Sequence, residues 1–597
     1  MDHIGGRKRT HYCGELRPAH IGQRVTAAGW VQRRRDLGAL IFVDLRDRTG
    51  LLQLAFDEEC PAELLEKARG LRSEYVVMAV GVLRERSAKN PELPTGAVGL
   101  AVTGLLLLGK SETPPFEIVE NCPTSELTRL KYRYLDLRRP DLQRNILLRH
   151  RIAKITRDYF DENGFVEIET PMMIKSTPEG ARDYLVPSRV RPGSFYALPQ
   201  SPQMYKQLCM VAGFDRYIQL ARCFRDEDLR ADRQPEFTQI DLEMSFVELE
   251  DILNMVEGYV ERLDRELELG VEFPIPRMTY RDAVERFGSD KPDTRYAMEL
   301  WNASDLLAGC GFGVFESALE TGSVRGVTAK GAYDTLTRKE IDKLTEMVKG
   351  IGAKGLAWAR IAAQGTVASS FGKFIPEETM RAVIARADAQ PGDVIFLVAD
   401  GKNSLALSVL GALRQALARK LGLIPGDRLN FLWITEFPFF DWDEDLQQFV
   451  AMHHPFTSPT DDSLAILESD KAGVLAKAAD LTLNGIEMSS GSIRITDPEL
   501  QQRIFTLLGL TEEEINLKFG FLVDAFRYGP PPHGGMGLGL DRLVMQLLGC
   551  ESLRDVVAFP KVQNASEPMT ECPSPVDAAQ LKELGLAFAP AHAKGGS

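Results

Sequence analysis

The chain has 597 residues, which is too long for a single hydrophobic core and predicts three or more domains. Hydrophobic residues make up 44% of the chain and charged residues 26%, as in ordinary soluble globular proteins, so we expect disorder only locally. The formal net charge of -14 excludes a uniformly basic nucleic-acid coat protein, and a polyanionic partner would have to bind a local basic patch.

The eight cysteines are scattered, with no Cys-x-x-Cys pair and no histidine spacing for zinc, which is typical of reduced thiols in the cytosol. No apolar run approaches the ~18 residues of a membrane span, and the polar N-terminus lacks a signal-peptide core. We therefore expect a cytoplasmic protein with no membrane partner.

The region from Arg24 to about Gly109 consists of short β-rich runs with one helical interruption, which predicts a small β-barrel. Residues 1–50 carry ten Lys and Arg against five Asp and Glu, so this barrel should have a basic rim. Residues 104–111 match the phosphate-loop pattern, but four leucines fill its middle and prolines follow where a helix should begin. We interpret this run as a strand that ends in a linker.

Residues 111–140 contain four prolines and predict a hinge. Apolar residues at roughly helical spacing then predict an amphipathic helix that stops at Gly164, followed by a strand in residues 165–173. The pattern alone leaves open whether this helix packs on its own domain or on a second copy of the chain. Residues 176–184 are rich in turn formers and predict a loop, and a helix should begin at Ser201 and Pro202 and place Lys206 one turn after Gln203.

Residues 217–246 predict a β-hairpin whose long polar turn contains Arg225, Glu227 and Arg230. In the second strand, alternation should direct one set of side chains into the core (Ile240, Leu242, Met244 and Phe246) and another to the opposite face (Phe237, Gln239, Asp241 and Glu243). Arginine pairs with phosphate and an aromatic ring stacks on a purine, so the second face predicts a nucleotide site. A solvated charged hairpin is the alternative.

After residue 293 the chain becomes rich in Gly and Ala, and alternating strands and helices up to residue 430 predict an inserted α+β domain. Beyond it, His453 and His454 are adjacent and should point in different directions. Asp480 and Glu487 suit magnesium beside a triphosphate, although two acidic residues in a polar stretch are more often merely solvated. A glycine-dense strand then leads to Arg542 at a helix start, where the arginine and the helix dipole both favour phosphate.

Several of these stretches resemble motifs of the class II aminoacyl-tRNA synthetases. The helix and strand that end at Pro171 resemble motif 1, the hairpin with Arg225 and Phe237 resembles motif 2, and the strand before Arg542 resembles motif 3. Residues 30–47 are similar to the N-terminal OB-fold of the aspartyl, asparaginyl and lysyl enzymes, and residues 293–430 resemble the extra domain of the bacterial aspartyl enzymes.

The resemblance implies a multidomain fold of α+β and all-β parts. Residues 1–110 would form an OB-fold anticodon-binding barrel and residues 111–140 a hinge. Residues 141–292 and 431–563 would form a catalytic core on an antiparallel sheet. Residues 293–430 would be the inserted α+β domain of the bacterial type, and residues 564–597 a C-terminal extension. Motif 1 would make the protein a homodimer.

The resemblance also implies the site residues. Arg225 and Arg542 would be catalytic. The residues that bind aspartate would be Glu179, Ser201, Gln203, Lys206, Arg225, Asp241, His453 and Arg494. The residues that bind ATP would be Arg225, Glu227, Gln234, Phe237, Glu487, Gly539, Leu540, Asp541 and Arg542. Asp480 and Glu487 would hold Mg²⁺ with the ATP, and Arg33, Arg35, Phe42 and Gln53 would contact the anticodon.

The function that the resemblance implies is activation of L-aspartate with ATP and transfer to the 3′ end of tRNA. Two cations, Lys206 and Arg494, suit a substrate carboxylate, and Asp241 suits its ammonium group. The sequence leaves open whether tRNA(Asn) is charged as well as tRNA(Asp). The alternatives are an inactive paralogue that binds RNA, which should have lost residues such as Arg225, and a stand-alone amide-forming relative, which would not need the basic barrel.

Overall fold

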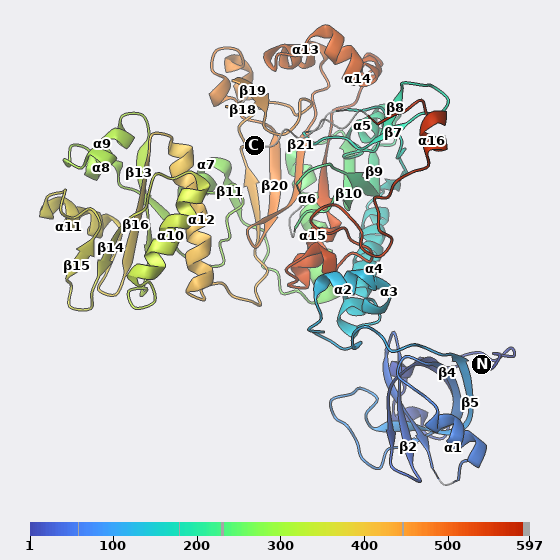
Figure 1. The fold of residues 1–597 in the computed structure, drawn as a ribbon. Coiled ribbons are helices and arrows are strands. Elements are labelled where there is room, and N and C mark those ends of the chain that lie inside the picture. Colours follow the sequence, from blue (N-terminus) through green and yellow to red (C-terminus); the bar gives the residue numbers. More distant parts are fainter. Residues whose placement is uncertain (58, 178–179, 229–231, 445–446, 589–597) are drawn as a thin grey trace. The chain divides into compact units, whose positions relative to one another are not determined.

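The structure is a computed structural model that describes residues 1–57, 59–177, 180–228, 232–444 and 447–588 (Figure 1). The chain divides into two compact units. The first contains residues 1–150 and 552–576, and the second contains residues 151–228, 232–551 and the segment from residue 577. Within the described ranges, none of the helices has the length and apolar character needed to cross a membrane.

The first unit contains the predicted barrel. Its strands are β1 (Arg24–Asp36), β2 (Ile41–Asp47), β3 (Gly50–Phe56), β4 (Val76–Glu85) and β5 (Val98–Gly109), closed in the order β1-β2-β3-β5-β4. Helix α1 (Ala62–Arg69) lies between β3 and β4 in the chain. Side chains such as Val31, Val43 and Leu54 alternate inward and are fully buried. Strand β5 ends at Gly109 without a following helix, as expected for a linker and not for a phosphate loop.

Charged side chains organise the rest of the first unit, which contains α2 (Glu126–Lys131), α3 (Arg133–Asp136) and the start of α4 (Pro140–Glu162). The fully buried Asp136 accepts hydrogen bonds from Arg133 at 2.7 Å and Arg139 at 2.9 Å. Arg133 also donates to the backbone carbonyls of Arg554 and Val557. The predicted hinge region is therefore tied to the segment that follows the last core helix.

The second unit is built on an eight-stranded sheet in the order β11-β17-β20-β21-β22-β10-β9-β6. Its strands are β6 (Val166–Glu167), β9 (Arg216–Phe224), β10 (Glu236–Ser245), β11 (Arg277–Thr279), β17 (Phe431–Thr435), β20 (Ala478–Leu483), β21 (Ile486–Ile493) and β22 (His533–Gly539). Only the two edge pairs, β11 with β17 and β6 with β9, are parallel. A sheet that is antiparallel apart from its two edge pairs is thus present, as the resemblance implies.

Helices and two small hairpins surround this sheet. The helices are α5 (Gln203–Val211), α6 (Leu249–Leu267), α7 (Tyr280–Phe287), α13 (Pro498–Leu507), α14 (Glu512–Phe526), α15 (Leu540–Leu547) and, near the C-terminus, α16 (Ala578–Glu583). One hairpin pairs β7 (Leu185–Pro187) with β8 (Phe195–Ala197), and the other pairs β18 (Phe440–Asp443) with β19 (Gln448–Ala451).

Alternation in β10 follows the prediction except at its end. Ile240, Leu242 and Met244 are buried, but Phe246 is 72% exposed, so its assignment to the core is wrong. The strand ends at Ser245, and Phe246 has a left-handed φ of +58°, which turns its side chain out of the alternation. The strand expected in residues 165–173 is also shorter than predicted, because only Val166 and Glu167 pair with β9.

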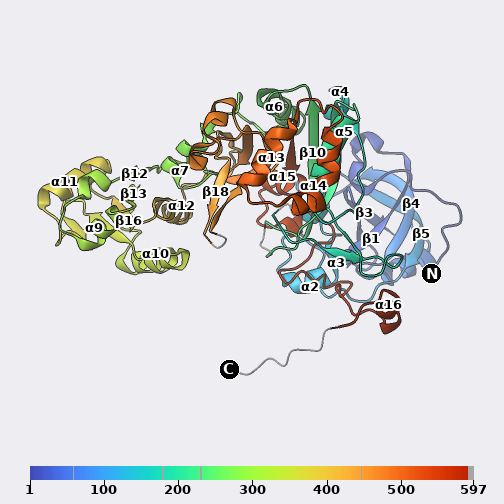
Figure 2. The same ribbon diagram turned by 90° about the horizontal axis from the view of Figure 1, so that it is seen from above.

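The inserted segment forms a separate five-stranded sheet in the order β12-β13-β16-β14-β15. Its strands are β12 (Leu300–Asn302), β13 (Ser323–Ala329), β14 (Ala357–Ile361), β15 (Val367–Ser369) and β16 (Val394–Asp400). Its helices are α8 (Ser304–Leu307), α9 (Gly313–Leu319), α10 (Arg338–Ile351), α11 (Glu377–Arg386) and α12 (Asn403–Lys420). Figures 1 and 2 show α10 and α12 on one side of the sheet and α9 and α11 on the other. Helices on both faces explain why β16 reads as a continuous apolar run: Phe396 and Leu397 pack into different cores.

Candidate active site

The candidate site lies on one face of the eight-stranded sheet, around β10 and its neighbour β22. Asp241 pairs with Gly537 and Glu243 pairs with Gly535, and cross-strand partners point to the same face. On the next strand, Ser490 and Ser492 pair with the same two glycines. Polar side chains from β10 and β21 therefore share one face across β22, which has glycine at the two positions between them.

Glycine is required at residue 535 by close approach. A Cβ atom built there would lie 2.2 Å from the backbone carbonyl oxygen of Leu242 and 2.0 Å from Oε2 of Glu243, both far inside contact distance. The glycine-dense sequence of β22 thus makes room for the carboxylates of the neighbouring strand.

Four buried charged side chains, which we call the charge quartet, occupy this face: Lys206, Asp241, Glu243 and Arg494. Nζ of Lys206 lies 2.5 Å from Asp241 and 3.2 Å from Glu243. Arg494 binds both oxygens of Glu243, at 2.8 and 3.1 Å. All four are less than 5% exposed, and their formal charges cancel. Buried ions need partners, so the two carboxylates allow Lys206 and Arg494 to be buried as cations at this face of the sheet.

The two carboxyl groups of the quartet differ in pKa. Burial raises the pKa of Asp241 above its ordinary value, although Lys206 opposes this effect. Burial would also raise the pKa of Glu243, but the charges of Arg494 and Lys206 outweigh it and lower the pKa to about 2. Glu243, which the sequence placed on this face without a role, is thus the anion that holds both cations.

The adjacent histidines point in different directions, as predicted. His453 packs edge-on against Phe437, and its Nε2 lies 3.6 Å from Asp480. Nε2 of His454 lies 2.8 Å from Arg494, and burial together with that guanidinium keeps the pKa of His454 well below its ordinary value. The sequence favoured His453 as the substrate contact and did not predict that His454 supports Arg494.

The predicted nucleotide residues of the hairpin lie at the far end of the same face. Phe237 pairs with Cys223, and the guanidinium of Arg225 lies 5.1 Å from the centre of the Phe237 ring. In the described part of the chain, the side chain of Arg225 makes no hydrogen bond or ion pair. Glu227 binds Arg233 at 2.7 Å, and Gln234 is buried at 6% exposure. An unpaired guanidinium beside an aromatic ring is suited to a phosphate next to a stacked base.

Helix α15 is attached to this hairpin through two successive residues. The carboxylate of Asp541 accepts a hydrogen bond from the backbone N–H of Thr238 at 3.1 Å, so Asp541 fastens the helix start to β10. Arg542 donates to the backbone carbonyl of Glu487 at 3.2 Å, and its guanidinium lies 3.8 Å from Asp232. Gly539 ends β22 opposite Gln239, and Leu540 is buried. Arg542 thus contacts the loop that carries Arg225, although the two arginines are 317 positions apart in the sequence.

Asp480 and Glu487 reach the same face through a β-bulge. Thr482 pairs with Glu487 while Leu481 pairs with Ser489, so one residue of β21 is extra at this point. The bulge returns Glu487 to the face of Asp480. Burial and the charge of Asp480 raise the pKa of Glu487. Oδ1 of Asp480 is buried, and none of the described residues donates a hydrogen bond to it.

Two carboxylates that repel each other, one with an orphaned buried oxygen, fit a divalent cation. The described residues contain no group of three or more His, Cys, Asp or Glu that could hold a metal ion by themselves. A magnesium ion here would therefore depend on other ligands, as it does when phosphates and waters complete its shell.

The remaining predicted substrate residues come from α5 and the loop before it. Gln203 is 8% exposed, and its Nε2 has no hydrogen-bond partner within the described ranges. Ser201 accepts a hydrogen bond from the backbone N–H of Gln203 at 3.3 Å. Gln200 donates to Asp183 at 2.6 Å, near the end of the loop predicted in residues 176–184. Glu179 lies outside the described residues.

The four predicted anticodon residues lie together on the outside of the barrel. Arg33 and Gln53 both pair with Asp44, and Arg35 pairs with Phe42, so all four point to one face. The guanidinium of Arg35 lies 5.9 Å from the Phe42 ring centre. Phe42 is half-buried and not part of the barrel core, which makes its ring accessible for stacking.

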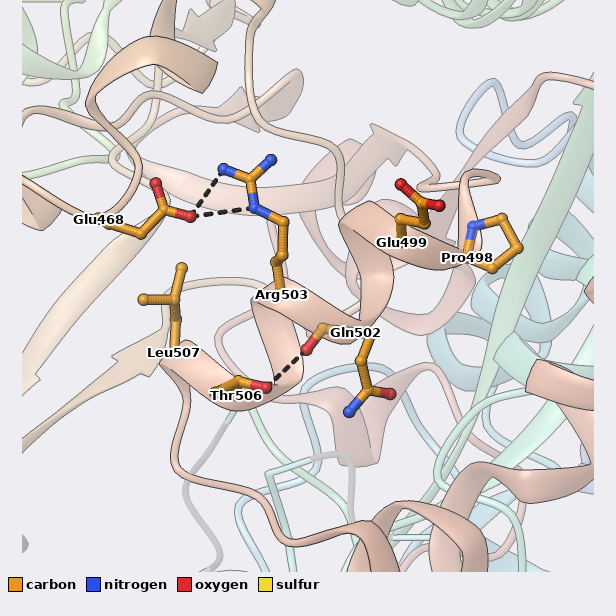
Figure 3. Close-up of a pocket in the computed structure, with 7 residues that line it drawn as sticks. All are labelled: Glu468, Pro498, Glu499, Gln502, Arg503, Thr506 and Leu507. Carbon is orange, nitrogen blue, oxygen red and sulfur yellow. Dashed lines mark hydrogen bonds and ion pairs between the residues drawn. The ribbon is translucent and has the colours of Figure 1, made fainter.

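A pocket of about 510 Å³ lies elsewhere in the second unit, beside α13 (Figure 3). Its lining residues are Glu468, Pro498, Glu499, Gln502, Arg503, Thr506 and Leu507. None of the predicted site residues lines it, and two of its charged residues, Arg503 and Glu468, pair with each other. It is not part of the candidate site.

Comparisons with known proteins agree with this architecture. The family described as tRNA synthetases class II (D, K and N) matches residues 125–563, and the OB-fold nucleic acid binding domain matches residues 25–102. The chain is 56% identical over 590 residues to the aspartate–tRNA ligase of Ruminiclostridium cellulolyticum, covering 98% of this chain and 99% of that protein. It is also 56% identical over 591 residues to the aspartate–tRNA(Asp/Asn) ligase of Symbiobacterium thermophilum, covering 97% and 99%.

Solved structures show the same fold at low sequence identity. The asparaginyl-tRNA synthetase of Pyrococcus horikoshii, complexed with asparaginyl-adenylate, has a TM-score of 0.57 and 20% identity over 93% of this chain and 98% of that chain. The aspartyl-tRNA synthetase of Entamoeba histolytica has a TM-score of 0.57 and 20% identity over 93% and 92%. With a family match over more than half its length and relatives that it matches almost from end to end, the chain belongs to the class II tRNA synthetases of the D, K and N group.

Proposed function

We propose that this enzyme activates L-aspartate with ATP and transfers the aspartyl group to the 3′ end of tRNA(Asp). The observation that carries the proposal is the charge quartet, which holds two cations and a carboxylate of raised pKa under the same sheet face as Arg225 and Phe237. The names of the 56% identical relatives support aspartate as the amino acid.

The reaction has two steps. In the first, a carboxylate oxygen of aspartate attacks the α-phosphorus of ATP, the bond from that phosphorus to the β-phosphate oxygen breaks, and pyrophosphate leaves with the electron pair. In the second, a hydroxyl of the terminal ribose of tRNA attacks the carbonyl carbon of aspartyl-adenylate. AMP leaves with the electron pair, and the hydroxyl proton is released. No covalent intermediate with the enzyme is needed.

The proposed roles of the side chains follow their positions. Arg225 would bind the α-phosphate and the attacking carboxylate, Phe237 would stack on adenine and Glu227 would accept from the adenine amino group. Gln234 and the backbone of residues 539–541 would line the nucleotide, and Arg542 would bind the γ-phosphate. These residues act by positioning and by neutralising charge, as is general for transfer at phosphorus.

On the amino-acid side, Lys206 and Arg494 would bind the side-chain carboxylate of aspartate and Asp241 its ammonium group. Ser201, Gln203, Glu179 and His453 would complete the pocket. Asp480 and Glu487 would hold Mg²⁺, which when bound withdraws charge from the phosphate oxygens. The orphaned oxygen of Asp480 supports this assignment.

The test is ATP–pyrophosphate exchange on the full-length protein, with aspartate, asparagine or lysine as the amino acid and with or without tRNA. We expect exchange with aspartate as the amino acid and no exchange with asparagine or lysine. Exchange driven only by asparagine or lysine, or no exchange with any of the three, would contradict the proposal. Charging purified tRNA(Asp) and tRNA(Asn) then decides whether one or both are substrates, a point on which the relatives' names differ.

We also propose that two copies associate through the motif 1 region. Apolar side chains are exposed in β6 and in the segment just after it: Val166 is 45% exposed, Met172 37% and Met173 57%. A second copy that packed on this segment would cover them, as the resemblance to motif 1 implies. Sedimentation equilibrium should give twice the chain mass, and a monomer at micromolar concentration would contradict the proposal.

A further inference from the structure

The segment that leads from α7 into the inserted domain packs against the catalytic sheet at Asp293. Gly485, in the turn between β20 and β21, has a φ of +81°, and a Cβ atom there would lie 2.9 Å from Cβ of Asp293. From the other side, Arg414 of α12 donates to the backbone carbonyl of Asp293 at 2.8 Å. The linker at residues 289–295 is thus fixed between the strand turn and the inserted domain.

This linker brings Lys291 to the edge of the candidate nucleotide site. Nζ of Lys291 lies 3.2 Å from Asp290 and 3.8 Å from Oε2 of Glu487. The second distance is too long for a hydrogen bond, and the Lys291 side chain is 42% exposed. An ammonium group has three donors, and in the described part of the chain only Asp290 accepts from this one. Lys291 therefore has donors to spare.

Two cations lie close to Glu487, one at its backbone carbonyl and one near its side-chain carboxylate. Arg542 binds its backbone carbonyl at 3.2 Å, and Lys291 approaches its carboxylate. The other charges around that carboxylate are the acids Asp480 and Asp290. A ligand bound between the Glu487 carboxylate and Arg542 would consequently meet Lys291 as the next positive group.

We propose that Lys291 binds the terminal phosphates of the nucleotide, the two that leave as pyrophosphate. This inference rests on the proposed function, because it assumes that ATP lies between Arg225 and Arg542. A triphosphate held by those two arginines presents its β- and γ-oxygens beside Glu487, where a flexible ammonium group with free donors can reach them. The inserted domain, through Arg414 and Asp293, then has the task of keeping the Lys291 backbone in place.

The competing explanation is a static ion pair, in which Lys291 only neutralises Glu487. The two explanations differ in which nucleotide they affect. A phosphate ligand matters for ATP and pyrophosphate but not for AMP, which lacks the terminal phosphates. A structural ion pair that shapes the site would affect all three.

The test is isothermal titration calorimetry of the full-length protein with Mg-ATP, Mg-pyrophosphate and AMP, in the absence of aspartate so that no reaction occurs. The variants are Lys291→Met, which keeps the apolar stem, and Lys291→Arg, which keeps the charge. The matched control is Lys330→Met in the inserted domain, where the lysine also lies near two carboxylates, Asp388 at 3.0 Å and Asp393 at 3.6 Å.

We expect Lys291→Met to weaken binding of Mg-ATP and Mg-pyrophosphate by about tenfold, the usual effect of losing one charge-assisted contact. AMP should bind unchanged, Lys291→Arg should recover most of the loss, and Lys330→Met should match the wild type. Unchanged binding of Mg-ATP by Lys291→Met, or equal weakening of all three ligands, would overturn the inference. If the wild type itself bound no Mg-ATP and catalysed no aspartate-dependent exchange, the proposed function would fail first.

Discussion

Replacement of Glu243 by Gln tests whether the charge quartet holds the catalytic sheet together. Glu243 is fully buried and binds Arg494 through both oxygens, with Lys206 3.2 Å away. Glutamine has nearly the same shape but leaves Lys206 and Arg494 with only Asp241 as a counter-charge. Removal of one partner from a buried ion pair costs about 3–5 kcal/mol in general.

The lowered pKa of Glu243 gives a second value for the free energy that its charge contributes to the folded state. A pKa lowered from 4.5 to about 2 means that ionised Glu243 stabilises the folded state by ~3 kcal/mol at neutral pH. Because the folded pKa is the lower one, this stabilisation is complete above pH 4.5 and is lost as the pH falls toward 2. Glutamine mimics the protonated acid, so the wild type and Glu243→Gln should become alike at low pH.

Hydrogen exchange measured by mass spectrometry suits this prediction, because a multidomain chain does not unfold in one step. At pH 7 we expect peptides of β10 and β22 to exchange about 100-fold faster in Glu243→Gln, while barrel peptides stay unchanged. Near pH 3 the difference should shrink to roughly tenfold, or ~1 kcal/mol. The control is Glu272→Gln, which breaks an exposed pair with Arg428 and should change exchange by less than threefold. An acceleration below fivefold at pH 7, or the same acceleration at both pH values, would refute the reasoning.

Three further predictions concern activity and tRNA binding. Arg225→Ala should reduce ATP–pyrophosphate exchange to less than about a tenth, a loss of more than ~1.4 kcal/mol, and greater retention would contradict its role. Asp480→Asn should raise the magnesium concentration needed for half-maximal exchange by about tenfold, and chelation of the metal should stop exchange in the wild type; an unchanged magnesium titration would exclude Asp480 as a ligand. Phe42→Ala should weaken tRNA binding in a filter assay by about tenfold, as loss of a stacked base does, with exchange unaffected. A parallel loss of exchange would indicate misfolding instead.

The local patterns in the sequence predicted the fold well, and the pairing of charges across the fold much less well. Alternation in β10 placed Asp241 and Glu243 on one face correctly, because the period of a strand is fixed by its backbone. The same rule failed at Phe246, since a single left-handed residue ended the strand. The strand period could not indicate that Lys206, which precedes Asp241 by 35 residues, contacts the carboxylates of Asp241 and Glu243. That contact depends on how α5 packs on the sheet.

The bulge in β21 shows a second reason why the sequence pattern did not predict the contacts in the site. Strict alternation from Ser490 would have placed Glu487 on the opposite face from Asp480, and only the extra residue opposite Leu481 and Thr482 brings them together. A bulge changes no residue type and has no reliable sequence signal. The magnesium prediction therefore rested on the family resemblance and not on the strand pattern, and the geometry that supports it came from the register.

The neutral quartet also bears on how the proposed enzyme would distinguish aspartate from its competitors. Without substrate, Lys206 and Arg494 are already balanced by Asp241 and Glu243, so the site is not a reservoir of free positive charge. A substrate carboxylate must share Lys206 and Arg494 with the carboxylates that already bind them. The gain in binding free energy is largest for a group that can accept hydrogen bonds from both cations at once. Asparagine offers an amide, whose NH₂ group would face donors, and lysine would place a third cation beside two buried ones. Both leave buried groups without partners, which is the kind of mismatch that gives discrimination of several orders of magnitude. In this arrangement Glu243 competes with the substrate carboxylate for both cations and limits the affinity for aspartate, so Glu243→Gln should raise the ratio of aspartate to asparagine activation where the fold survives.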